Sequence, residues 1–206
     1  MKLYYSPSAC SVGIHILLEE IGTPFETELL DIRSGQQYAP AFRQINPKSK
    51  VPTLIRDDGR ALTEFGTIAF WLAQTNPEAN LLPADIDGQT RVRELMDFMV
   101  STVHMRGFTF IIAARKFVSD GAAQAELGAF GKKVATDGLA ALSQELGTQD
   151  YLLGEFGIAD AALFYLVHWA AAFDVETPDN LKSFYKRMQG RPAVARVLER
   201  EQAVAA

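Results

Sequence analysis

The sequence predicts an α/β plus all-α protein, in which a small mixed domain is followed by a domain made of helices. Short β-type runs alternate with helical patterns over residues 2–75, whereas every long apolar pattern beyond this region repeats at helical spacing. Between them lies a stretch with two prolines and little periodicity, residues 76–83. We therefore expect domains at residues 1–78 and 89–206, joined by a linker at 79–88.

The chain opens with a strand, a helix and a second strand. Residues 2–5 form a short β-type run that ends at a turn containing Pro7, and Ser11 then begins an apolar pattern with helical spacing. The breakers at residues 22–24 end this helix, and residues 25–30 alternate as a strand. Two strands joined through a helix are expected to run parallel.

Two further strands and a helix complete the first domain. After a polar loop, residues 51–55 and 61–63 have the pattern of strands around a hairpin turn, and a helix begins at Glu64. The resulting βαβ-ββα order is that of a thioredoxin-like domain. The remaining periodic patterns predict helices at residues 91–116, 124–146, 158–173, 181–188 and 193–203.

Composition and charge argue against several classes of partner. Twenty basic and twenty-five acidic residues give a net charge of -5, without the concentrated basic face that binding to a phosphate backbone requires, so we expect no nucleic-acid partner. The longest apolar stretch, residues 161–173, is shorter than the roughly 20 residues of a membrane-spanning helix, and no secretory signal is apparent. We therefore expect a cytoplasmic protein with no membrane partner. The three histidines, His15, His104 and His168, lack a metal-binding spacing, so we expect no metal.

Cys10 is the single cysteine of the chain, so it forms no internal disulfide. It falls in the turn before the first helix, where N–H groups and the helix dipole favour an anion and lower the pKa of a thiol. The position therefore suits a nucleophilic thiolate, and a small buried packing residue is the alternative. Hydroxyl groups close by compete for the same role, on Tyr5, Ser6, Ser8 and Ser11.

Two further positions have the features of a peptide-binding site. Val51-Pro52 begins a strand, and a cis bond there would turn the N–H and C=O of Val51 outward to an extended peptide; an ordinary edge proline is the alternative. Glu64 opens the next helix, whose first N–H groups can hold a carboxylate while the Glu64 side chain accepts from an ammonium. The alternative there is a carboxylate that only complements the helix dipole.

The helical half contributes a polar group and an aromatic set. His104 shares a helix face with Asp97 and Ser101, which suits a binding site, although a lone helix histidine is more often a structural residue. Aromatic side chains at helical spacing either line an apolar pocket or form core. Those in this half include Phe98, Phe108, Phe110, Phe117, Tyr165 and Trp169.

These features occur in one order along the chain, namely YYSPSACS, INPKSKVPTL, LTEFGTI and, within the helical half, GIADAALF. That order resembles the glutathione S-transferase superfamily over essentially the whole chain. The cysteine in the first turn and the later histidine are most similar to the bacterial beta class. The resemblance implies an enzyme that takes glutathione as co-substrate, uses no metal and forms a homodimer.

By position, the resemblance assigns catalytic roles to Cys10 and His104. The glutathione contacts that it implies come from Cys10, Lys50, Val51, Pro52, Glu64, Phe65, Asp97, Ser101 and His104. The second-substrate pocket that it implies includes Tyr5, Phe108, Tyr165 and Trp169. Relatives usually place Ser, Ala or Gly at the position of Phe65, and a hydroxyl N-cap at the position of Gly157, three residues before Asp160.

On this resemblance we expect a detoxifying enzyme that activates the thiol of glutathione. The thiol would be conjugated to a small hydrophobic electrophile or used to reduce one, including peroxides. Isomerisation, ether or halide cleavage and disulfide reduction are alternatives on the same fold. A noncatalytic module that binds glutathione or a partner is an alternative of another class.

Overall fold

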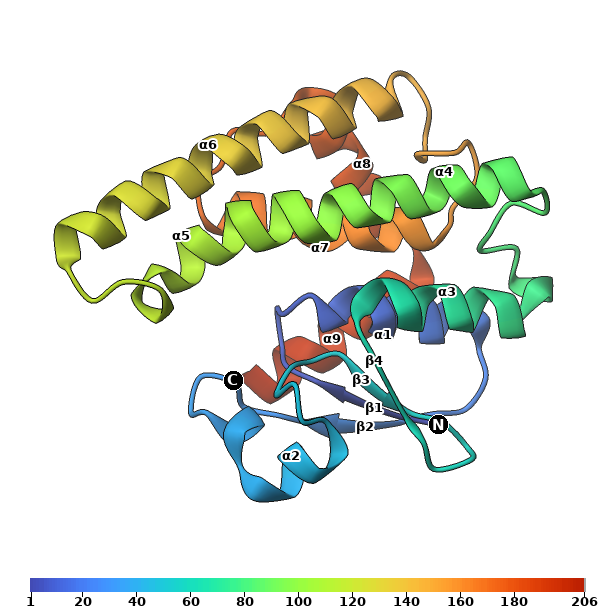
Figure 1. The fold of residues 1–206 in the computed structure, drawn as a ribbon. Helices are drawn as coiled ribbons and strands as arrows, with labels where there is room; N and C mark the ends of the chain where they lie inside the picture. The colour runs from blue at the N-terminus through green and yellow to red at the C-terminus, as the bar shows by residue number, and fades with distance from the viewer. Residues whose placement is uncertain (206) are drawn as a thin grey trace. The chain divides into compact units, whose positions relative to one another are not determined.

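A computed structural model describes residues 1–205 of the chain (Figure 1). The chain divides into two compact units, and each is treated separately below. Unit 1 comprises Met1–Pro83 together with the chain from Gln189 on, and unit 2 is Ala84–Met188. The division after Pro83 falls inside the stretch 79–88 that the sequence marks as a linker.

Unit 1 is built on a mixed sheet whose strand order, within the described residues, is β2-β1-β3-β4. The strands are β1 (Lys2–Tyr5), β2 (Glu26–Leu29), β3 (Thr53–Ile55) and β4 (Ala61–Thr63). β1 pairs parallel with β2 and antiparallel with β3, and β3 pairs antiparallel with β4. The predicted βαβ-ββα, thioredoxin-like order is confirmed.

Helices cover both faces of this sheet. α1 (Ser11–Ile21) packs beside α3 (Phe65–Thr75) on one face, and the short α2 (Pro40–Ile45) lies on the other (Figure 1). Short 3₁₀ turns occupy Gln36–Tyr38 and Pro77–Ala79. The apolar positions of the strands and helices meet in a core whose fully buried side chains include Leu3, Ile14, Leu17, Leu54, Ile68 and Leu72.

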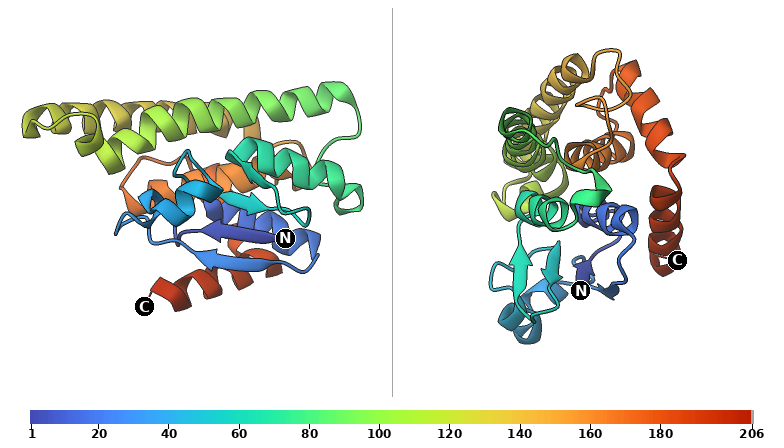
Figure 2. Two further views of the ribbon diagram at one scale, coloured as in Figure 1. Left: turned by 60° about the horizontal axis from the view of Figure 1, so that its bottom comes forward. Right: turned by 90° about the vertical axis from the view of Figure 1, so that its right-hand side faces the viewer.

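The last helix, α9 (Pro192–Ala205), belongs to unit 1 and lies along α1 (Figure 2). The sequence patterns predict one helical domain over residues 89–206, whereas the structure groups this final helix with the sheet. Complementary charge and apolar burial explain the grouping. Arg196 Nε lies 2.8 Å from a carboxylate oxygen of Glu19 on α1, and Val197 is fully buried.

Unit 2 is built from helices. They are α4 (Ile86–Asp97), a π-helical segment (Phe98–Phe108), α5 (Thr109–Ala113), a 3₁₀ turn (Ala114–Lys116), α6 (Gly121–Leu146), α7 (Ile158–Ala172) and α8 (Asp179–Gln189). The sequence predicts a single helix over residues 91–116. The structure has a helical run there, in which the middle segment is π-helical rather than α-helical. Within the described chain, no helix is both long and apolar enough to cross a membrane.

α6 and the π-helical segment approach each other closely because glycines line the contact. A Cβ added at Gly131 would lie 2.6 Å from the carbonyl oxygen of Gly107, a separation that real Cβ atoms do not adopt. A Cβ at Gly138 would lie 2.5 Å from Val103. The close approach therefore depends on the absence of side chains at these positions.

The start of the buried helix α7 is fixed by Asp160. Its carboxylate accepts hydrogen bonds from the N–H groups of Leu152 and Gly157, each at 2.9 Å, and the residue is 1% exposed. Gly157 has no side chain with which to return a bond, so one half of a capping box is present. The extended backbone of Gly157, φ -148°, places no demand for glycine at this position.

Candidate active site

The turn between β1 and α1 sets the position of Cys10. The Ser11 hydroxyl donates to the carbonyl oxygen of Ser6 and accepts from the N–H of Ser6, each at 3.2 Å, so the turn is closed on itself. Cys10 is the N-cap residue of α1 and is 8% exposed, and its Sγ donates to the carbonyl oxygen of Val51 at 3.7 Å. The structure thus brings together Cys10 and Val51, which are 41 residues apart.

The surroundings of Cys10 disfavour its thiolate. Burial raises the pKa of the Cys10 thiol from 9.0 to about 12. The N–H groups of Cys10 and Ser11 and the charge of Lys50 act in the opposite direction, while the charge of Glu64 adds to the rise. The prediction of a lowered pKa is therefore wrong, because loss of solvation outweighs the helix N-terminus.

A buried polar network ties the Cys10 turn to α9. Glu201 accepts from the N–H of Ser8 at 3.0 Å and lies 3.2 Å from His15 Nδ1. Glu201 is 5% exposed and His15 1%, and Ser8 has a positive φ of 58°. Directional bonds to one carboxylate therefore hold the turn that precedes Cys10.

Among the described residues, no group of three or more His, Cys, Asp or Glu side chains could hold a metal ion.

The loop before β3 is organised by the buried side chain of Asn46, which is 1% exposed. Its amide nitrogen donates to the carbonyl oxygen of Lys50 at 2.9 Å and to Thr53 Oγ1 at 2.8 Å. Its amide oxygen accepts from the N–H of Lys48 at 3.0 Å. These bonds fix the backbone at both lysines and lead directly into Val51, whose peptide bond to the buried Pro52 is cis.

Glu64 lies at the N-terminus of α3 in an uncommon conformation. Its φ is 71° and its ψ 128°, which for a residue other than glycine costs on the order of 1–3 kcal/mol. The side chain does not cap its own helix. Instead its Oε1 accepts from Lys48 Nζ at 2.7 Å, and the same ammonium donates to Thr63 Oγ1 at 2.9 Å.

Phe65 follows Glu64 as the first residue of α3. Its side chain is 5% exposed and belongs to the core of unit 1. The ring is therefore packed inside the unit rather than standing in solvent at the start of the helix.

In unit 2, the polar residues named from the sequence share one helical run. Ser101 donates to the carbonyl oxygen of Asp97 at 2.6 Å, so its hydroxyl is bonded within the helix. His104 lies on the π-helical segment with its Nδ1 3.3 Å from the hydroxyl of Tyr165. Its ring also meets that of Trp169 edge to face, with 4.8 Å between centroids.

The aromatic residues assigned to a second-substrate pocket are buried. Phe108 and Tyr165 are fully buried and Trp169 is 7% exposed. Trp169 meets Phe108 at 5.5 Å and Tyr165 at 5.0 Å between ring centroids, so the rings pack on one another. Tyr5 lies in unit 1, where it is 5% exposed and its ring centroid is 5.4 Å from that of His15.

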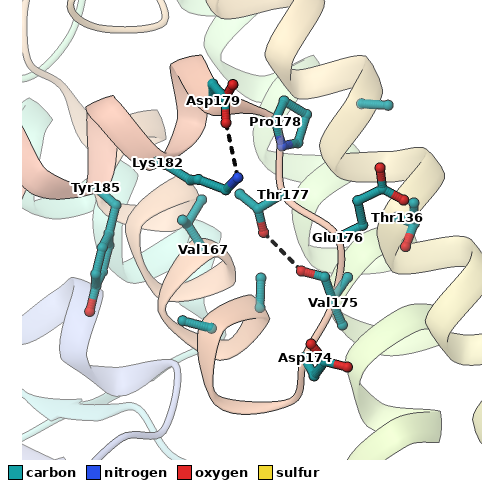
Figure 3. Close-up of a pocket in the computed structure, with 13 residues that line it drawn as sticks. Thr136, Val167, Asp174, Val175, Glu176, Thr177, Pro178, Asp179, Lys182 and Tyr185 are labelled. Atoms are coloured by element: carbon teal, nitrogen blue, oxygen red, sulfur yellow. Dashed lines mark hydrogen bonds and ion pairs between the residues drawn. The ribbon is translucent and has the colours of Figure 1, made fainter.

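A separate groove of about 820 Å³ opens in unit 2, between the end of α7 and the start of α8 (Figure 3). Its lining combines alanine and valine side chains with acidic groups and Lys182, whose Nζ is 2.9 Å from Asp179 Oδ1. None of the site residues named from the sequence lines it. The lining residues are Thr136, Ala140, Val167, Ala170, Ala171, Asp174, Val175, Glu176, Thr177, Pro178, Asp179, Lys182 and Tyr185.

Three polar residues of unit 1 were not singled out from the sequence: Asn46, Lys48 and Glu201. Asn46 and Lys48 stand within the motif INPKSKVPTL, so the Asn-Pro step was the available signal for a structured loop. Glu201 gave no local signal, because its bond to His15 spans 186 residues.

Comparisons with known proteins identify the family. The chain is 32% identical to glutathione S-transferase GstA of Escherichia coli O157:H7 over 98% of both chains. Models of the glutathione S-transferase N-terminal and C-terminal domains match residues 7–75 and 122–200. The chain belongs to the glutathione S-transferase family. It is therefore an enzyme of the transferase class, and the glutathione S-transferase resemblance found in the sequence is confirmed.

Solved glutathione S-transferases share the fold along the whole chain. A glutathione transferase homologue from Sulfitobacter, solved with bound glutathione, is 26% identical, covers 97% of both chains and superposes with a TM-score of 0.90. The beta-class enzyme of Sphingomonas chungbukensis is 29% identical, covers 98% of both chains and has a TM-score of 0.84. These similarities support the bacterial beta-like subclass.

Proposed function

We propose that the chain binds glutathione along the Cys10, Val51 and Glu64 surface of unit 1. It activates the thiol for conjugation to small hydrophobic electrophiles or for the reduction of peroxides. The observation that carries this proposal is that unit 1 contains three suitable groups. The thiol of Cys10 lies beside the backbone of Val51, and the carboxylate of Glu64 stands at the N-terminus of α3 on strained backbone with a positive φ. Extended peptides bind to exposed backbone in this way, and a carboxylate suits a ligand ammonium.

Each part of this surface has a role in the proposal. The backbone of Val51, before Pro52, pairs with the cysteinyl part of glutathione, and Lys50 attracts the glycyl carboxylate. Glu64 accepts from the γ-glutamyl ammonium. The N–H groups at the start of α3, including that of Phe65, favour the γ-glutamyl carboxylate.

The chemistry in the proposal uses the thiol of glutathione itself as the nucleophile. Its proton leaves to solvent, the sulfur attacks the electrophilic carbon, and the leaving group departs with the electron pair. Cys10 is neutral at physiological pH because its pKa is near 12, and its single S–H turns from the carbonyl oxygen of Val51 to donate to that sulfur. By resemblance, His104, Asp97 and Ser101 are assigned to the binding of glutathione, and Tyr5, Phe108, Tyr165 and Trp169 to that of the second substrate.

Disulfide reduction is the second candidate, because Cys10 supplies a thiol at the start of α1. A thiolate of Cys10 would attack glutathione disulfide, form a mixed disulfide and release one glutathione as thiolate. Glutathione-dependent isomerisation and ether or halide cleavage remain alternatives.

The proposal also includes a homodimer, a cytoplasmic location and a detoxifying role. Light scattering that finds a monomer at micromolar concentration contradicts the homodimer.

The glutathione site is tested by isothermal titration calorimetry on Glu64→Ala. Loss of the carboxylate leaves the ligand ammonium unpaired, so we expect binding weaker by about a hundredfold. Glu78→Ala is the matched control, because Glu78 is an exposed carboxylate of the same unit outside the proposed surface. Wild-type affinity in Glu64→Ala would show that the carboxylate is not part of the site.

The reaction is tested with the wild-type protein and glutathione against an aryl halide, a hydroperoxide and a mixed disulfide. Turnover of the first two supports transferase and peroxidase chemistry. Turnover of the disulfide alone, abolished in Cys10→Ala, supports the second candidate instead. Tight glutathione binding without turnover of any of the three contradicts the proposed reaction.

A further inference from the structure

Lys48 is a charged residue at the glutathione surface to which the proposed function gives no role. Its ammonium donates to Glu64 Oε1 at 2.7 Å and to Thr63 Oγ1 at 2.9 Å. The Lys48 and Glu64 side chains are each 52% exposed, and exposed ion pairs contribute little to stability. Lys48 nevertheless donates to the Glu64 carboxylate, which in the proposed function accepts from the ammonium of the ligand.

Both charges are held by backbone that is fixed independently of the ion pair. Glu64 is presented at φ 71° at the start of α3. Lys48 stands on the loop that the buried Asn46 side chain organises, through the bond from its own N–H to the Asn46 amide oxygen at 3.0 Å. The fold therefore brings one cation and one anion together from segments 16 residues apart.

We propose that Lys48 and Glu64 together form a clamp for a zwitterionic α-amino-acid head group, in which Lys48 selects ligands that carry the α-carboxylate. This inference rests on the proposed glutathione site and adds a specificity residue to it. When the ligand arrives, its ammonium replaces Lys48 on the Glu64 carboxylate. The displaced Lys48 ammonium turns to the α-carboxylate of the ligand while Thr63 remains within its reach.

Charge complementarity is the reason that this exchange is favourable. A neutral pair on the protein opens to receive a head group that is also neutral overall, so every charge has a partner before and after binding. Lysine suits the task because its ammonium has three donors on a flexible four-carbon stem. The clamp fits γ-glutamyl peptides with a free amine and carboxylate, and it disfavours analogues in which either group is missing.

The test compares three ligands by isothermal titration calorimetry. They are glutathione, γ-aminobutyryl-Cys-Gly, which lacks the α-carboxylate, and glutaryl-Cys-Gly, which lacks the ammonium. For Lys48→Met we expect glutathione to bind about tenfold more weakly than to wild type, because a charge-assisted contact is lost. Binding of γ-aminobutyryl-Cys-Gly should be no weaker, so the preference for the α-carboxylate falls by about tenfold.

Two further variants separate recognition from a structural effect. Lys48→Arg keeps the cation and should retain most of the preference. Lys50→Met should weaken all three ligands by the same factor, because the glycyl carboxylate that Lys50 attracts is common to them. Thermal unfolding of each variant at the wild-type midpoint establishes that the fold is intact.

One outcome overturns the clamp and leaves the proposed function standing. If Lys48 only neutralises Glu64, Lys48→Met will strengthen both ligands that carry an ammonium, and the preference for the α-carboxylate will not change. Wild-type protein that binds no glutathione overturns the proposed function and the clamp together.

Discussion

The candidate site residues of unit 1 and those of unit 2 are held in place by different kinds of interaction. In unit 1, buried polar side chains such as Asn46 and Glu201 fix turns through directional bonds, and Glu64 takes a positive φ of 71°. In unit 2, the ring of His104 packs against those of Tyr165 and Trp169, and helices meet through glycine. The candidate site of unit 1 therefore depends on a few directional hydrogen bonds, whereas that of unit 2 depends on how well side chains fill the space between helices.

The largest expected effect concerns the thiol of unit 1, where burial and the helix N-terminus act in opposite directions. With a pKa of about 12 in place of 9.0, the thiolate fraction of Cys10 near neutral pH is lower by about a thousandfold. We expect iodoacetamide to alkylate Cys10 of the ligand-free protein about a thousandfold more slowly at pH 7.5 than the same thiol in urea. The rate should rise about tenfold per pH unit up to the pKa.

The same shift predicts how stability depends on pH. The unfolded thiol loses its proton near pH 9 and the folded thiol near pH 12, so the unfolded chain binds fewer protons between these values. The stability due to protonated Cys10 is complete below pH 9 and is lost as pH rises toward 12. Cys10→Ala should remove this component from urea unfolding curves. If the native protein is alkylated as fast as the protein unfolded in urea, the helix N-terminus rather than burial controls the pKa of the Cys10 thiol.

The next effect tests whether one carboxylate holds the turn before Cys10. Glu201→Ala leaves the N–H of Ser8 and the ring of His15 without this buried partner, so we expect unfolding to become easier by about 3 kcal/mol. Urea unfolding measures the change. Glu199→Ala is the control, since Glu199 is an exposed carboxylate on the same helix, and it should change stability by less than about 0.5 kcal/mol. Equal effects of the two variants would refute the assigned role of Glu201.

The difference between the units also explains what the sequence could and could not predict. Val51-Pro52 and Glu64 could be proposed as site residues because proline at a strand start and an acid at a helix start are local signals. The ion pair of Lys48 with Glu64 and the bond of Glu201 to His15 join segments 16 and 186 residues apart, so no local pattern carries them. The burial of Cys10 likewise depends on what covers the turn.

The placement of α9 was unpredictable for a related reason. An amphipathic pattern over residues 193–203 predicts a helix with one buried face, but does not say which domain buries it. Arg196 meets Glu19 on α1, and this contact becomes visible only once both helices are placed. The same holds in unit 2, where Tyr165 and Trp169 could equally have lined a pocket or packed as core.

The smallest effect tests the dependence of unit 2 on close packing, and it compares two glycines of α6. A methyl group at Gly131 would lie 2.6 Å from the carbonyl oxygen of Gly107 and 2.9 Å from Phe110 Cβ, whereas one at Gly128 meets nothing within 4 Å. Alanine favours a helix over glycine by about 1 kcal/mol, so Gly128→Ala should stabilise the protein by somewhat less than that. Gly131→Ala should destabilise it by about 2 kcal/mol despite the same gain in propensity.

The same Gly→Ala substitution should change the free energy of unfolding in opposite directions at two positions of one helix that are three residues apart. The difference between the two values separates the effect of packing from that of helix propensity. Urea unfolding supplies both values, and calorimetry with glutathione shows whether the affinity follows. Gly131 belongs to unit 2 and lies outside the Cys10, Val51 and Glu64 surface of unit 1. Its substitution should therefore change stability with little change in glutathione affinity. If both alanines stabilise the protein, α6 and the π-helical segment can move apart at little cost, and the close contact at Gly131 does not contribute to stability.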